Sequence, residues 1–480
     1  MPDFTLASPL TMTIGGEAVP TKAALDVINP STGAPFGQMP DATPDQVDAA
    51  FNAAAEAFPH WRRDEGLRRK TLHAMADAIA ASADDIAPIL TAEQGKPLSR
   101  AHLELNFALA WLRYYGDLET PEQILRDDAE ARVSVQHRPL GVVAAIAPFN
   151  FPVSTGLAKV ATAMRAGNTV VLKPSPYTPL ATLKVGEILR SVVPAGVFNI
   201  LTGRDELGPM MTTHPLTRGI TFTGSTATGQ RIAAAAANEL TRMTLELGGN
   251  DAAIVLDDVD PELVATELFD RAFNNTGQVC IAPKRVYVPR GLRQALVDTF
   301  ADKARSAKVS DGFLPDTEYG PLNNIRQFQR VVELVDDALA HGAKVAAGGR
   351  AIEGPGYFHE LTILTDVTDG VRIVDEEQFG PALPIVEYSD VDDAVRRANA
   401  GKLGLASSVW SADPERAGAV AEQLDAGTTW VNAHSGVSPA YPFGGVKWSG
   451  LGTEGGPWGL DGLSDVKILN WNKSAVVRRS

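Results

Sequence analysis

The chain has 480 residues, of which 44% are hydrophobic and 21% are charged, and its formal net charge is −15 at pH 7. These values are ordinary for globular proteins and exclude a mostly disordered chain, and the length allows roughly three domains. The acidic balance gives no electrostatic footprint for nucleic acid or an anionic membrane, so we expect neither as a partner.

The N-terminal third of the chain predicts helices. The first residues, MPDFTLASPL, lack the pattern of a signal peptide, so we expect a cytoplasmic protein. Thr43 can cap a helix that begins at Pro44, and Gln46 completes a capping box. An Ala-rich helical region with few breakers follows over about 67–115.

From Arg132 onward, short apolar strands alternate with helical segments. A strand pair is followed by a buried apolar strand over 132–148, and further strands at 168–176, 196–203 and 219–229 each end in Gly, Pro or polar residues. This alternation predicts a doubly wound α/β sheet that binds a nucleotide at the carboxyl ends of its strands. The long uncharged run 139–158, the one that could be mistaken for a membrane helix, contains three prolines and therefore predicts none.

A second α/β stretch runs over about 251–448, and a strand follows Leu460. This terminal strand, in DVKILNWNKSAVV, has no obvious pairing partner in its own chain.

Two glycine-rich segments could contact a dinucleotide phosphate. The literal GxGxxG, GLGTEG at 450–455, has no strand directly before it and opens no clear helix, so we expect a loop there. TGSTATG at 223–229 follows a strand and opens a helix, where backbone N–H groups and the hydroxyls of Ser225 and Thr226 can hold a pyrophosphate. A plain helix cap explains this segment about as well.

Three polar residues are candidates for chemistry, and each also has an ordinary interpretation. Cys280, in GQVCIAP, is the sole cysteine, which excludes an intrachain disulfide and a Cys-rich metal site, so we expect no metal. A lone cysteine in an apolar run is usually a small core residue, whereas a nucleophile needs exposure and a low thiol pKa. Glu246, in TLELGGN, is either a base or a surface or capping group, and Asn150, in PFNFP, is by default a loop residue.

Taken together, these segments resemble the NAD(P)-dependent aldehyde dehydrogenase superfamily. PFNFP, LKPSP, FTGST, LELGGN, GQVC, EEQFGP and PFGGVKWSG occur in the order and spacing of that family, and the resemblance extends from about Val27 to about Leu469. It implies an α/β, aldehyde-dehydrogenase-like fold with three parts. These are a doubly wound NAD(P)-binding domain over 1–120 and 141–248, an α/β catalytic domain over 249–448, and a β-strand oligomerisation arm and tail over 121–140 and 449–480.

The resemblance also implies an assembly. The arm would join copies of the chain into a homodimer or homotetramer, with the unpaired terminal strand adding to the sheet of a neighbouring subunit.

The implied reaction is oxidation of a small-molecule aldehyde to the carboxylic acid with NAD(P)+. Cys280 would form a thiohemiacetal and then a thioester, which a water activated by Glu246 would hydrolyse. The Asn150 amide and the backbone N–H of Cys280 would form the oxyanion hole. Glu454 would relay protons, with Lys159 a weaker candidate beside it. The presence of Glu246 favours hydrolysis over transfer of the acyl group to coenzyme A.

The cofactor contacts follow from the same motifs. Lys173 would bind the adenosine ribose, and Glu377 and Phe379 would hold the nicotinamide ribose. NAD is the expected cofactor, and NADP is also allowed, because Pro176 stands where many NAD-preferring members have a ribose-binding glutamate. The full implied set is Phe149, Asn150, Lys173, Ser175, Pro176, Gly203, Thr223, Gly224, Ser225, Leu247, Glu377 and Phe379.

The implied substrate tunnel is largely aromatic. Phe149, Phe151 and Phe443 match tunnel positions, and such walls suit apolar or ring-bearing aldehydes. Ala158 stands where relatives that act on small aldehydes often have a tryptophan, so we expect a wider mouth. His434 lies near the tunnel by its position in the family pattern, although a structural histidine is the simpler interpretation.

Two other functions use the same residues. A thiol hydrolase would pair Cys280 with His434 and would need no nucleotide. A structural protein with this fold, such as certain lens crystallins, would tend to lose its catalytic groups, whereas this chain keeps Cys280, Glu246 and Asn150.

Overall fold

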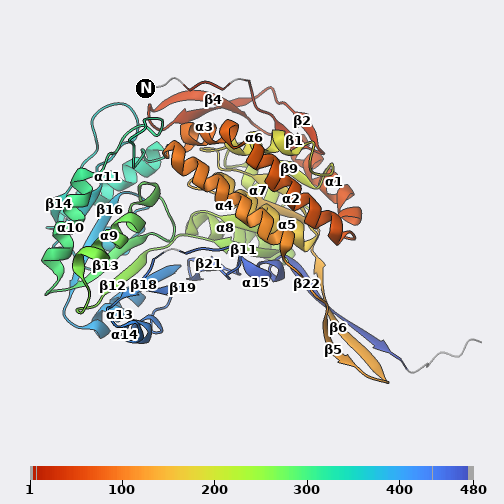
Figure 1. Cartoon of the computed structure of the whole chain (residues 1–480). Coiled ribbons are helices and arrows are strands. Elements are labelled where there is room, and N and C mark those ends of the chain that lie inside the picture. Colours follow the sequence, from red (N-terminus) through yellow and green to blue (C-terminus); the bar gives the residue numbers. More distant parts are fainter. Residues whose placement is uncertain (1–3, 7, 435, 474–480) are drawn as a thin grey trace, which may run out of the picture.

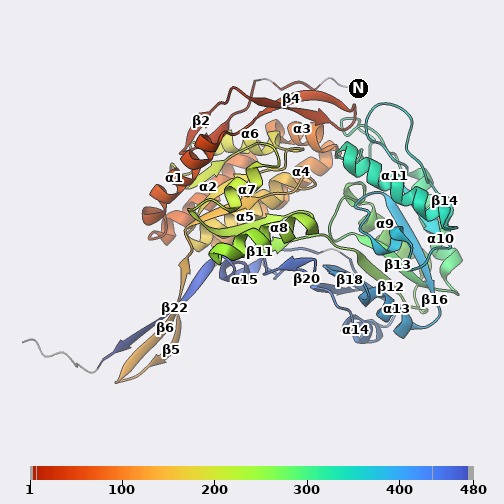
Figure 2. The same ribbon diagram turned by 180° about the vertical axis from the view of Figure 1, so that it is seen from behind.

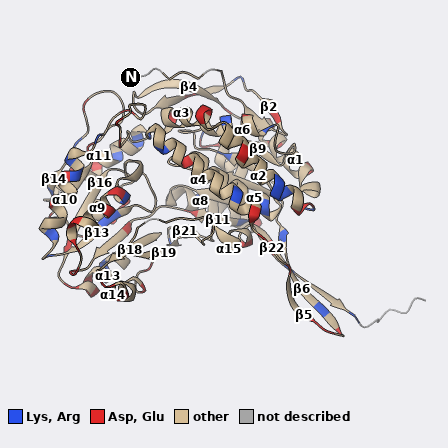
Figure 3. Ribbon diagram, in the orientation of Figure 1, with Lys and Arg blue, Asp and Glu red and all other residues tan. Residues whose placement is uncertain are grey.

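The computed structural model describes residues 4–6, 8–434 and 436–473. It shows two lobes, each built on a mainly parallel sheet, and a narrow arm that projects from the first lobe (Figure 1). Figure 3 shows basic and acidic residues interspersed over the helices of both lobes, so the acidic excess is not gathered in one block. Within the described ranges, no helix is long and apolar enough to cross a membrane. The cytoplasmic location stays a prediction.

The first lobe confirms the predicted doubly wound sheet. Its eight strands have the order β2-β1-β9-β8-β7-β10-β11-β21, and β7 to β11 run parallel. The order reverses between β7 and β10, which is where such sheets place a ligand at their carboxyl ends. The strands are β1 (Met12–Ile14), β2 (Glu17–Val19), β7 (Val142–Ile146), β8 (Thr169–Lys173), β9 (Phe198–Ile200), β10 (Thr217–Thr223), β11 (Arg242–Glu246) and β21 (Gly450–Leu451).

Helices cover both faces of this sheet. They are α1 (Pro44–Trp61), α2 (Glu65–Ala81), α3 (Ala83–Gln94), α4 (Leu98–Asp117), α5 (Pro152–Ala166), α6 (Leu180–Leu189), α7 (Leu207–Thr212) and α8 (Thr226–Ala236). The core of one face joins α2 to α6, and the opposite face carries α1, α7 and α8 (Figures 1 and 2). The hairpin β3 (Ala24–Asn29) and β4 (Ala34–Pro40) lies along the edge of the lobe.

The predicted helix start at Thr43 is confirmed. The Thr43 hydroxyl accepts from the Gln46 N–H, and the Gln46 side chain accepts from the Thr43 N–H at 3.0 Å. The helical region over 67–115 is divided into three helices. The breaks fall at Ser82 and at Gly95, whose φ of +97° ends α3 in the left-handed conformation that glycine adopts readily.

The second lobe contains a seven-stranded sheet of order β14-β15-β16-β13-β12-β18-β19, parallel except for β14. Its strands are β12 (Asp251–Val255), β13 (Pro283–Pro289), β14 (Lys344–Ala347), β15 (Thr362–Thr365), β16 (Ala382–Tyr388), β18 (Ala406–Trp410) and β19 (Thr428–Val431). Helices α9 (Pro261–Ala272) and α10 (Arg293–Ser306) pack on one face. The other face packs against α11 (Ile325–Ala340), α12 (Arg372–Asp375), α13 (Val391–Asn399) and α14 (Pro414–Ala421). A short pair, β17 (Leu403–Gly404) and β20 (Val446–Lys447), lies beside this sheet.

The arm has three antiparallel strands in the order β22-β6-β5, with bounds β5 (Gln123–Asp127), β6 (Ala131–Pro139) and β22 (Ser464–Asn472). The expectation that the terminal strand has no partner in its own chain is wrong. β22 pairs with β6 from Ser464 opposite Pro139 to Asn472 opposite Ala131, because β6 has a free edge once it has paired with β5. Residues 474–480 of the expected tail lie outside the described residues.

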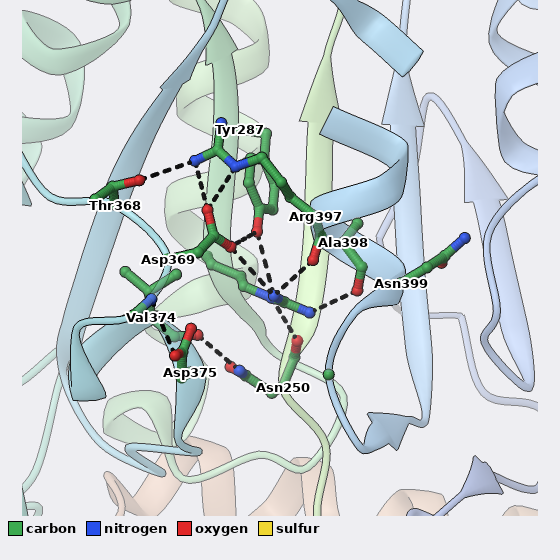
Figure 4. Close-up of polar contacts among 12 residues, drawn as sticks. Asn250, Tyr287, Thr368, Asp369, Val374, Asp375, Arg397, Ala398 and Asn399 are labelled. Carbon is green, nitrogen blue, oxygen red and sulfur yellow. Dashed lines mark hydrogen bonds and ion pairs between the residues drawn. The ribbon is translucent and has the colours of Figure 1, made fainter. Parts of the chain in front are cut away.

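A buried arginine ties the second sheet to helix α13. Arg285 is 4% exposed, and its guanidinium donates to the carbonyl oxygens of Asn250 at 3.0 Å and Ala398 at 2.8 Å. The last carbonyls of a helix have no partner within the helix, so a cation there both satisfies them and complements the helix dipole. Figure 4 shows Tyr287, Asp369 and Arg397 around this point, and Tyr287 donates to Asp369 at 2.8 Å.

We expect Arg285→Met to lower the free energy of unfolding by about 3 kcal/mol, because buried carbonyls lose their donor. Arg396→Met is the matched control, since Arg396 lies on α13 but its side chain is 70% exposed and its ion pair with Asp393 is at the surface. That control should change stability by no more than about 0.5 kcal/mol. Urea unfolding followed by fluorescence measures both, and equal losses in the two variants would contradict the assignment.

Candidate active site

A short segment, Leu247–Asn250, leads directly from the end of β11 in the first sheet to the start of β12 in the second sheet. A Cβ atom on Gly248 would lie 2.3 Å from a carboxylate oxygen of Glu377, and one on Gly249 would lie 2.4 Å from the carbonyl oxygen of Cys280. Only a residue without a side chain allows the approach to the backbone at Gly249, and a side chain at Gly248 would require the Glu377 carboxylate to move. The two glycines therefore bring the end of β11 against the segments that carry Cys280 and Glu377.

Cys280 lies in the loop between the 3₁₀ turn Asn274–Gly277 and β13, and it is half-buried. It packs against an apolar cluster that includes Phe151 and Phe443. Burial raises the pKa of the Cys280 thiol to about 12, and the negative charges of nearby carboxylates add to this rise. The low pKa that a resident thiolate needs is therefore absent, so attack by Cys280 requires a base that takes the proton.

Asn150 lies in the loop between β7 and α5, and its side chain reaches the Cys280 loop. The Asn150 amide donates to the Gln278 carbonyl oxygen at 2.8 Å, two residues before Cys280. The Asn150 carbonyl accepts from Lys96 Nζ at 2.9 Å and from Asn275 Nδ2 at 3.1 Å. The side chain is thus a fixed hydrogen-bond donor beside the sulfur-bearing segment.

Glu246 is the last residue of β11, and it is 3% exposed. Among the described residues, neither of its carboxylate oxygens has a hydrogen-bond partner. Burial raises the pKa of Glu246 well above its usual range, the charge of Glu454 raises it further, and Lys159 opposes both. Burying a carboxyl group without a hydrogen-bond partner destabilises the folded protein, so its presence calls for an explanation such as a catalytic role. A raised pKa makes the carboxylate a stronger base.

Glu454 and Lys159 form a second polar group beside Glu246. Lys159 Nζ lies 2.5 Å from Glu454 Oε1, and Thr221 Oγ1 donates to the same oxygen at 3.1 Å. Glu454 is also joined to Phe443 by two backbone hydrogen bonds of 2.7 Å. The structure therefore connects the carboxylate predicted for proton relay to an aromatic residue of the Cys280 cluster.

The segment GLGTEG does not form the plain loop that we expected. Gly450–Leu451 form β21, which pairs antiparallel with β11, and the six-residue helix α15 (Gly456–Asp461) begins directly after it. The segment lies at the edge of the sheet rather than in a βαβ unit, so it is no dinucleotide fingerprint. Glu454 lies in this segment, between β21 and α15.

The end of β8 carries a buried cation. Lys173 is 4% exposed, and burial lowers its pKa to about 8, with Asp205 opposing this shift. Its hydrogen bond to the Pro174 carbonyl is long, at 3.5 Å. Thr223, at the end of β10, has a buried hydroxyl without a partner among the described residues. These donors at a switch point fit a dinucleotide.

Ser225 caps helix α8, as the simpler interpretation of TGSTATG expected. Its hydroxyl oxygen accepts from the Thr228 N–H at 3.3 Å, and the Gly224 N–H donates to the Glu246 carbonyl at 3.0 Å. The cap leaves the other N–H groups at the start of α8 available to an anion. Leu247, which follows Glu246, packs in the small core beneath this helix.

Aromatic residues of the two lobes pack against one another around Phe149. Phe149 packs edge-on against Phe379 at 5.6 Å and against Tyr177 at 6.1 Å. A pocket of about 420 Å³ lies alongside, lined by Pro176, Tyr177 and Arg204 of the first lobe and by residues 323–326 and Tyr357 of the second. Ser175 directly precedes this lining, and Gly203 lies beside Asp41 at the same end of the sheet.

The EEQFGP segment is held by residues that sequence reasoning missed. Glu377 accepts from the Gly249 N–H at 3.1 Å, and burial raises its pKa. Gln327, at the start of α11, donates to the carbonyls of Gln378 and Phe379 at 2.7 and 3.0 Å. Phe379 has a φ of +46°, which a non-glycine residue adopts only when its surroundings hold it.

Lys284 is a second residue that sequence reasoning missed. It is 2% exposed, donates to the Gly277 carbonyl at 2.7 Å, and lies 5.4 Å from the centre of the Phe379 ring. Its positive charge lowers the pKa of both Cys280 and Glu377 against the effect of burial. The available signal was a lysine four residues after Cys280, next to Arg285 at the start of an apolar strand sequence.

Of the residues predicted to line the substrate tunnel, Ala158 lies outside the Cys280 cluster, and the ring of His434 is held by two polar contacts. Ala158 is buried in the large core of the first lobe rather than in the Cys280 cluster. His434 contacts Ser408 Oγ and the Ile281 carbonyl oxygen, both at 2.8 Å, and burial lowers its pKa to about 3. With both ring nitrogens engaged, His434 is a neutral structural residue, and the hydrolase alternative lacks its base.

Known proteins share both sequence and structure with this chain. The model of the aldehyde dehydrogenase family matches residues 18–469. Aldehyde dehydrogenase LUC3 of a Fusarium species is 38% identical over 461 residues, covering 95% of this chain and 97% of the relative. The succinate-semialdehyde dehydrogenase [NADP(+)] GabD of Escherichia coli is 36% identical, covering 93% of this chain and 94% of the relative.

Solved structures agree. The NAD+ complex of aldehyde dehydrogenase from Bacillus cereus superposes with a TM-score of 0.94 at 33% identity, covering 97% of both chains. The resemblance drawn from the ordered motifs is thereby confirmed, as is the aldehyde-dehydrogenase-like fold. This chain belongs to the aldehyde dehydrogenase family.

Proposed function

We propose that the protein oxidises an aldehyde to the carboxylic acid with NAD(P)+ and releases the acid by hydrolysis. The observation that carries this proposal is the buried, unpartnered carboxyl of Glu246 next to the Cys280 loop. A general base needs a raised pKa and an unoccupied oxygen, and Glu246 has both.

Reaction begins at the Cys280 sulfur. The raised pKa of the thiol means that the proton leaves as the sulfur attacks the aldehyde carbon, and Glu246 is the base that receives it. The new C–S bond gives a thiohemiacetal whose oxygen carries the negative charge. The Asn150 amide and the Cys280 backbone N–H donate to that oxygen, and losing one such donor costs about 3 kcal/mol.

The cofactor would be held by Lys173 and the start of α8 at its adenosine and phosphate end, and by Glu377 and Phe379 at the other. When bound, the cofactor would supply the hydride acceptor, and Cys280 would then carry the acyl group as a thioester. Glu246 would first pass the thiol proton on toward Glu454 and Lys159, which frees its carboxylate. It would then take a proton from water as the water oxygen attacks the thioester carbon. The C–S bond would break to give the acid and the Cys280 thiolate, which would take the proton held by Glu246 and become the thiol again.

The substrate proposed is an apolar or aromatic aldehyde. The residues packed around Cys280 are apolar, among them Phe151, Phe443 and Trp430. Lys96, the cation over the Phe151 ring, is already paired with Glu104, so it is not free to bind a substrate carboxylate. Relatives named for succinate semialdehyde thus share the reaction with this chain rather than the proposed substrate.

The arm is proposed to join copies of the chain into a homodimer or homotetramer. Ile124 and Leu125 of β5 and Val466, Ile468 and Trp471 of β22 are all exposed on it. Apolar side chains on a narrow projecting sheet favour contact with another protein surface. This proposed contact uses the exposed apolar side chains of the arm instead of the unpaired terminal strand expected from the sequence, because β22 is already paired with β6.

Glu246→Gln is the direct test of the proposal. Acylation should slow as well, because Glu246 receives the thiol proton. A thiol is a stronger acid than water, so solvent can replace the base in the attack step better than in hydrolysis, and we expect a slowed burst of about one reduced nicotinamide per active site. Steady-state turnover should then be 10²- to 10⁴-fold slower, roughly the contribution of a general base. Stopped-flow absorbance measures both phases. Cys280→Ala is the control and should give neither burst nor turnover, whereas wild-type turnover by Glu246→Gln at every pH would reject the assigned base.

The charges around Glu246 predict opposite pH shifts in two variants. Turnover should rise as Glu246 loses its proton. Lys159→Met removes the positive charge that lowers this pKa, so the rising limb of kcat should move to higher pH. Glu454→Gln removes the charge that raises the pKa, so the limb should move to lower pH. Thr221→Val, which changes no charge, should leave the midpoint in place, and a shift of both charge variants in one direction would refute the arrangement.

Pro176 predicts how cofactor preference can be changed. Pro176→Glu adds a carboxylate that can bond a ribose diol and repel a 2′-phosphate, so the ratio of kcat/KM for NAD to that for NADP should rise at least tenfold. Pro176→Gln can bond the diol without repelling phosphate and should give a smaller rise. Kinetics with each cofactor measure both variants, and an unchanged ratio in Pro176→Glu would remove this position as a determinant.

A further inference from the structure

A buried ion pair lies directly behind Asn150. Lys96 follows α3, Glu104 lies in the first half of α4, and their side chains are 1% and 0% exposed. Burial lowers the pKa of Lys96, and the charge of Glu104 opposes that shift. Removing two charges from water costs more than their attraction usually returns, so other contacts must account for the pair.

Lys96 holds the backbone of Asn150. Besides its ion pair with Glu104, Lys96 Nζ donates to the Asn150 carbonyl at 2.9 Å. The same ammonium lies 4.1 Å from the centre of the Phe151 ring, a cation–π contact with the next residue. Lys96 therefore contacts both the carbonyl oxygen of Asn150 and the side chain of Phe151, the next residue.

Glu104 holds the start of the helix that follows. One of its oxygens accepts from the backbone N–H groups of Val153 and Ser154 at 3.0 and 3.2 Å. The N-cap residue of α5, Phe151, makes no side-chain cap hydrogen bond. A carboxylate from α4 thus performs the capping that α5 lacks in its own sequence, where the helix dipole also favours a negative charge.

Asn150 is consequently fixed from both sides. Its carbonyl is held by Lys96 and Asn275, and the helix that begins two residues later is held by Glu104. With the backbone fixed, the direction of the side chain follows, and its amide is aimed at the Cys280 loop. A shift of about 1 Å in such a donor is enough to lose much of its effect.

We propose that Lys96 and Glu104 are positioning residues for the Asn150 amide. The pair does not contact the reacting atoms. It sets the amide where the oxyanion forms after Cys280 attacks the aldehyde. This inference rests on the proposed function, in which Asn150 donates to that oxyanion.

The test is a mutant cycle with the double variant Lys96→Met/Glu104→Gln. Both changes are close in volume, and together they remove the pair without leaving one buried charge alone. The glutamine introduced by Glu104→Gln keeps a side-chain oxygen that can still accept from the N–H groups of α5. We expect kcat for aldehyde oxidation to fall 10- to 100-fold, against 10²- to 10³-fold for Asn150→Ala. In the Asn150→Ala background, the double variant should cost less than about threefold more, because its effect passes through Asn150.

Two readouts separate positioning from general damage. Alkylation of Cys280 by iodoacetamide forms no oxyanion, so its rate should stay within about twofold of wild type. Arg165→Met is the matched control. Arg165 is 1% exposed, lies at the other end of α5, and pairs with Glu65 at 2.6 Å. It should lower the unfolding midpoint while leaving kcat within about threefold.

Each outcome has one meaning. If the double variant costs the same factor with and without Asn150, or slows alkylation as much as oxidation, the positioning role is wrong. If Asn150→Ala itself retains wild-type kcat, the proposed function fails at the oxyanion step instead. Should the double variant not fold, Glu104→Gln alone enters the same cycle. This variant keeps an acceptor for the N–H groups of Val153 and Ser154 but removes the charge that pairs with Lys96. We expect kcat to fall about tenfold when Asn150 is present and to show no further fall in the Asn150→Ala background.

Discussion

The site depends on the close passage of the Leu247–Asn250 segment between the two sheets. β11 ends in Glu246 and β12 begins at Asp251, so four residues carry the chain from one lobe to the other. Gly248 and Gly249 let the Glu377 and Cys280 segments pack against this crossing at distances that a side chain would forbid. Glu246, Cys280 and Glu377 thus come together because the two central residues of this segment have no side chains. A side chain at Gly249 would meet the Cys280 carbonyl oxygen, and one at Gly248 would meet the Glu377 carboxylate.

That convergence creates an electrostatic problem, which shapes the chemistry. Burial and the neighbouring carboxylates raise the pKa of the Cys280 thiol, so the nucleophile is held as a thiol rather than a thiolate. Lys284 on one side and Lys159 on the other oppose the carboxylates without neutralising them. Glu246 is buried, and neither of its carboxylate oxygens has a hydrogen-bond partner within the described part of the chain; burial and Glu454 raise its pKa, and Lys159 lowers it. Proton transfer to a base is therefore part of the proposed attack and of the proposed hydrolysis, in place of a preformed anion.

Much of this arrangement could be predicted from local sequence, and the remainder could not. Strand ends followed by Gly or polar residues placed Asn150, Lys173, Gly224 and Glu246 at one edge, because parallel strands share their carboxyl ends. The pairing of β22 with β6 was missed because its two strands lie far apart in the chain and neither carries a turn signal toward the other. GLGTEG looked like a loop because an edge strand of two residues leaves no periodicity to detect. Lys96 and Glu104 were missed because nothing in a helical sequence shows that its charges are buried.

The residues that were missed share a function that differs from that of the residues that were found. In the proposed reaction Cys280, Glu246 and Asn150 would supply the reacting or hydrogen-bonding atoms, and such atoms must be of particular types, so they leave a readable motif. Lys96, Glu104 and Gln327 act on backbone carbonyls and N–H groups, which every residue possesses. Their targets therefore carry no sequence signature. The contacts of Lys96 and Glu104 with the backbone around Asn150 can be recognised only once the fold has brought α4 and α5 together. For that reason the geometry of the proposed oxyanion hole is a property of the packed structure rather than of its sequence motif.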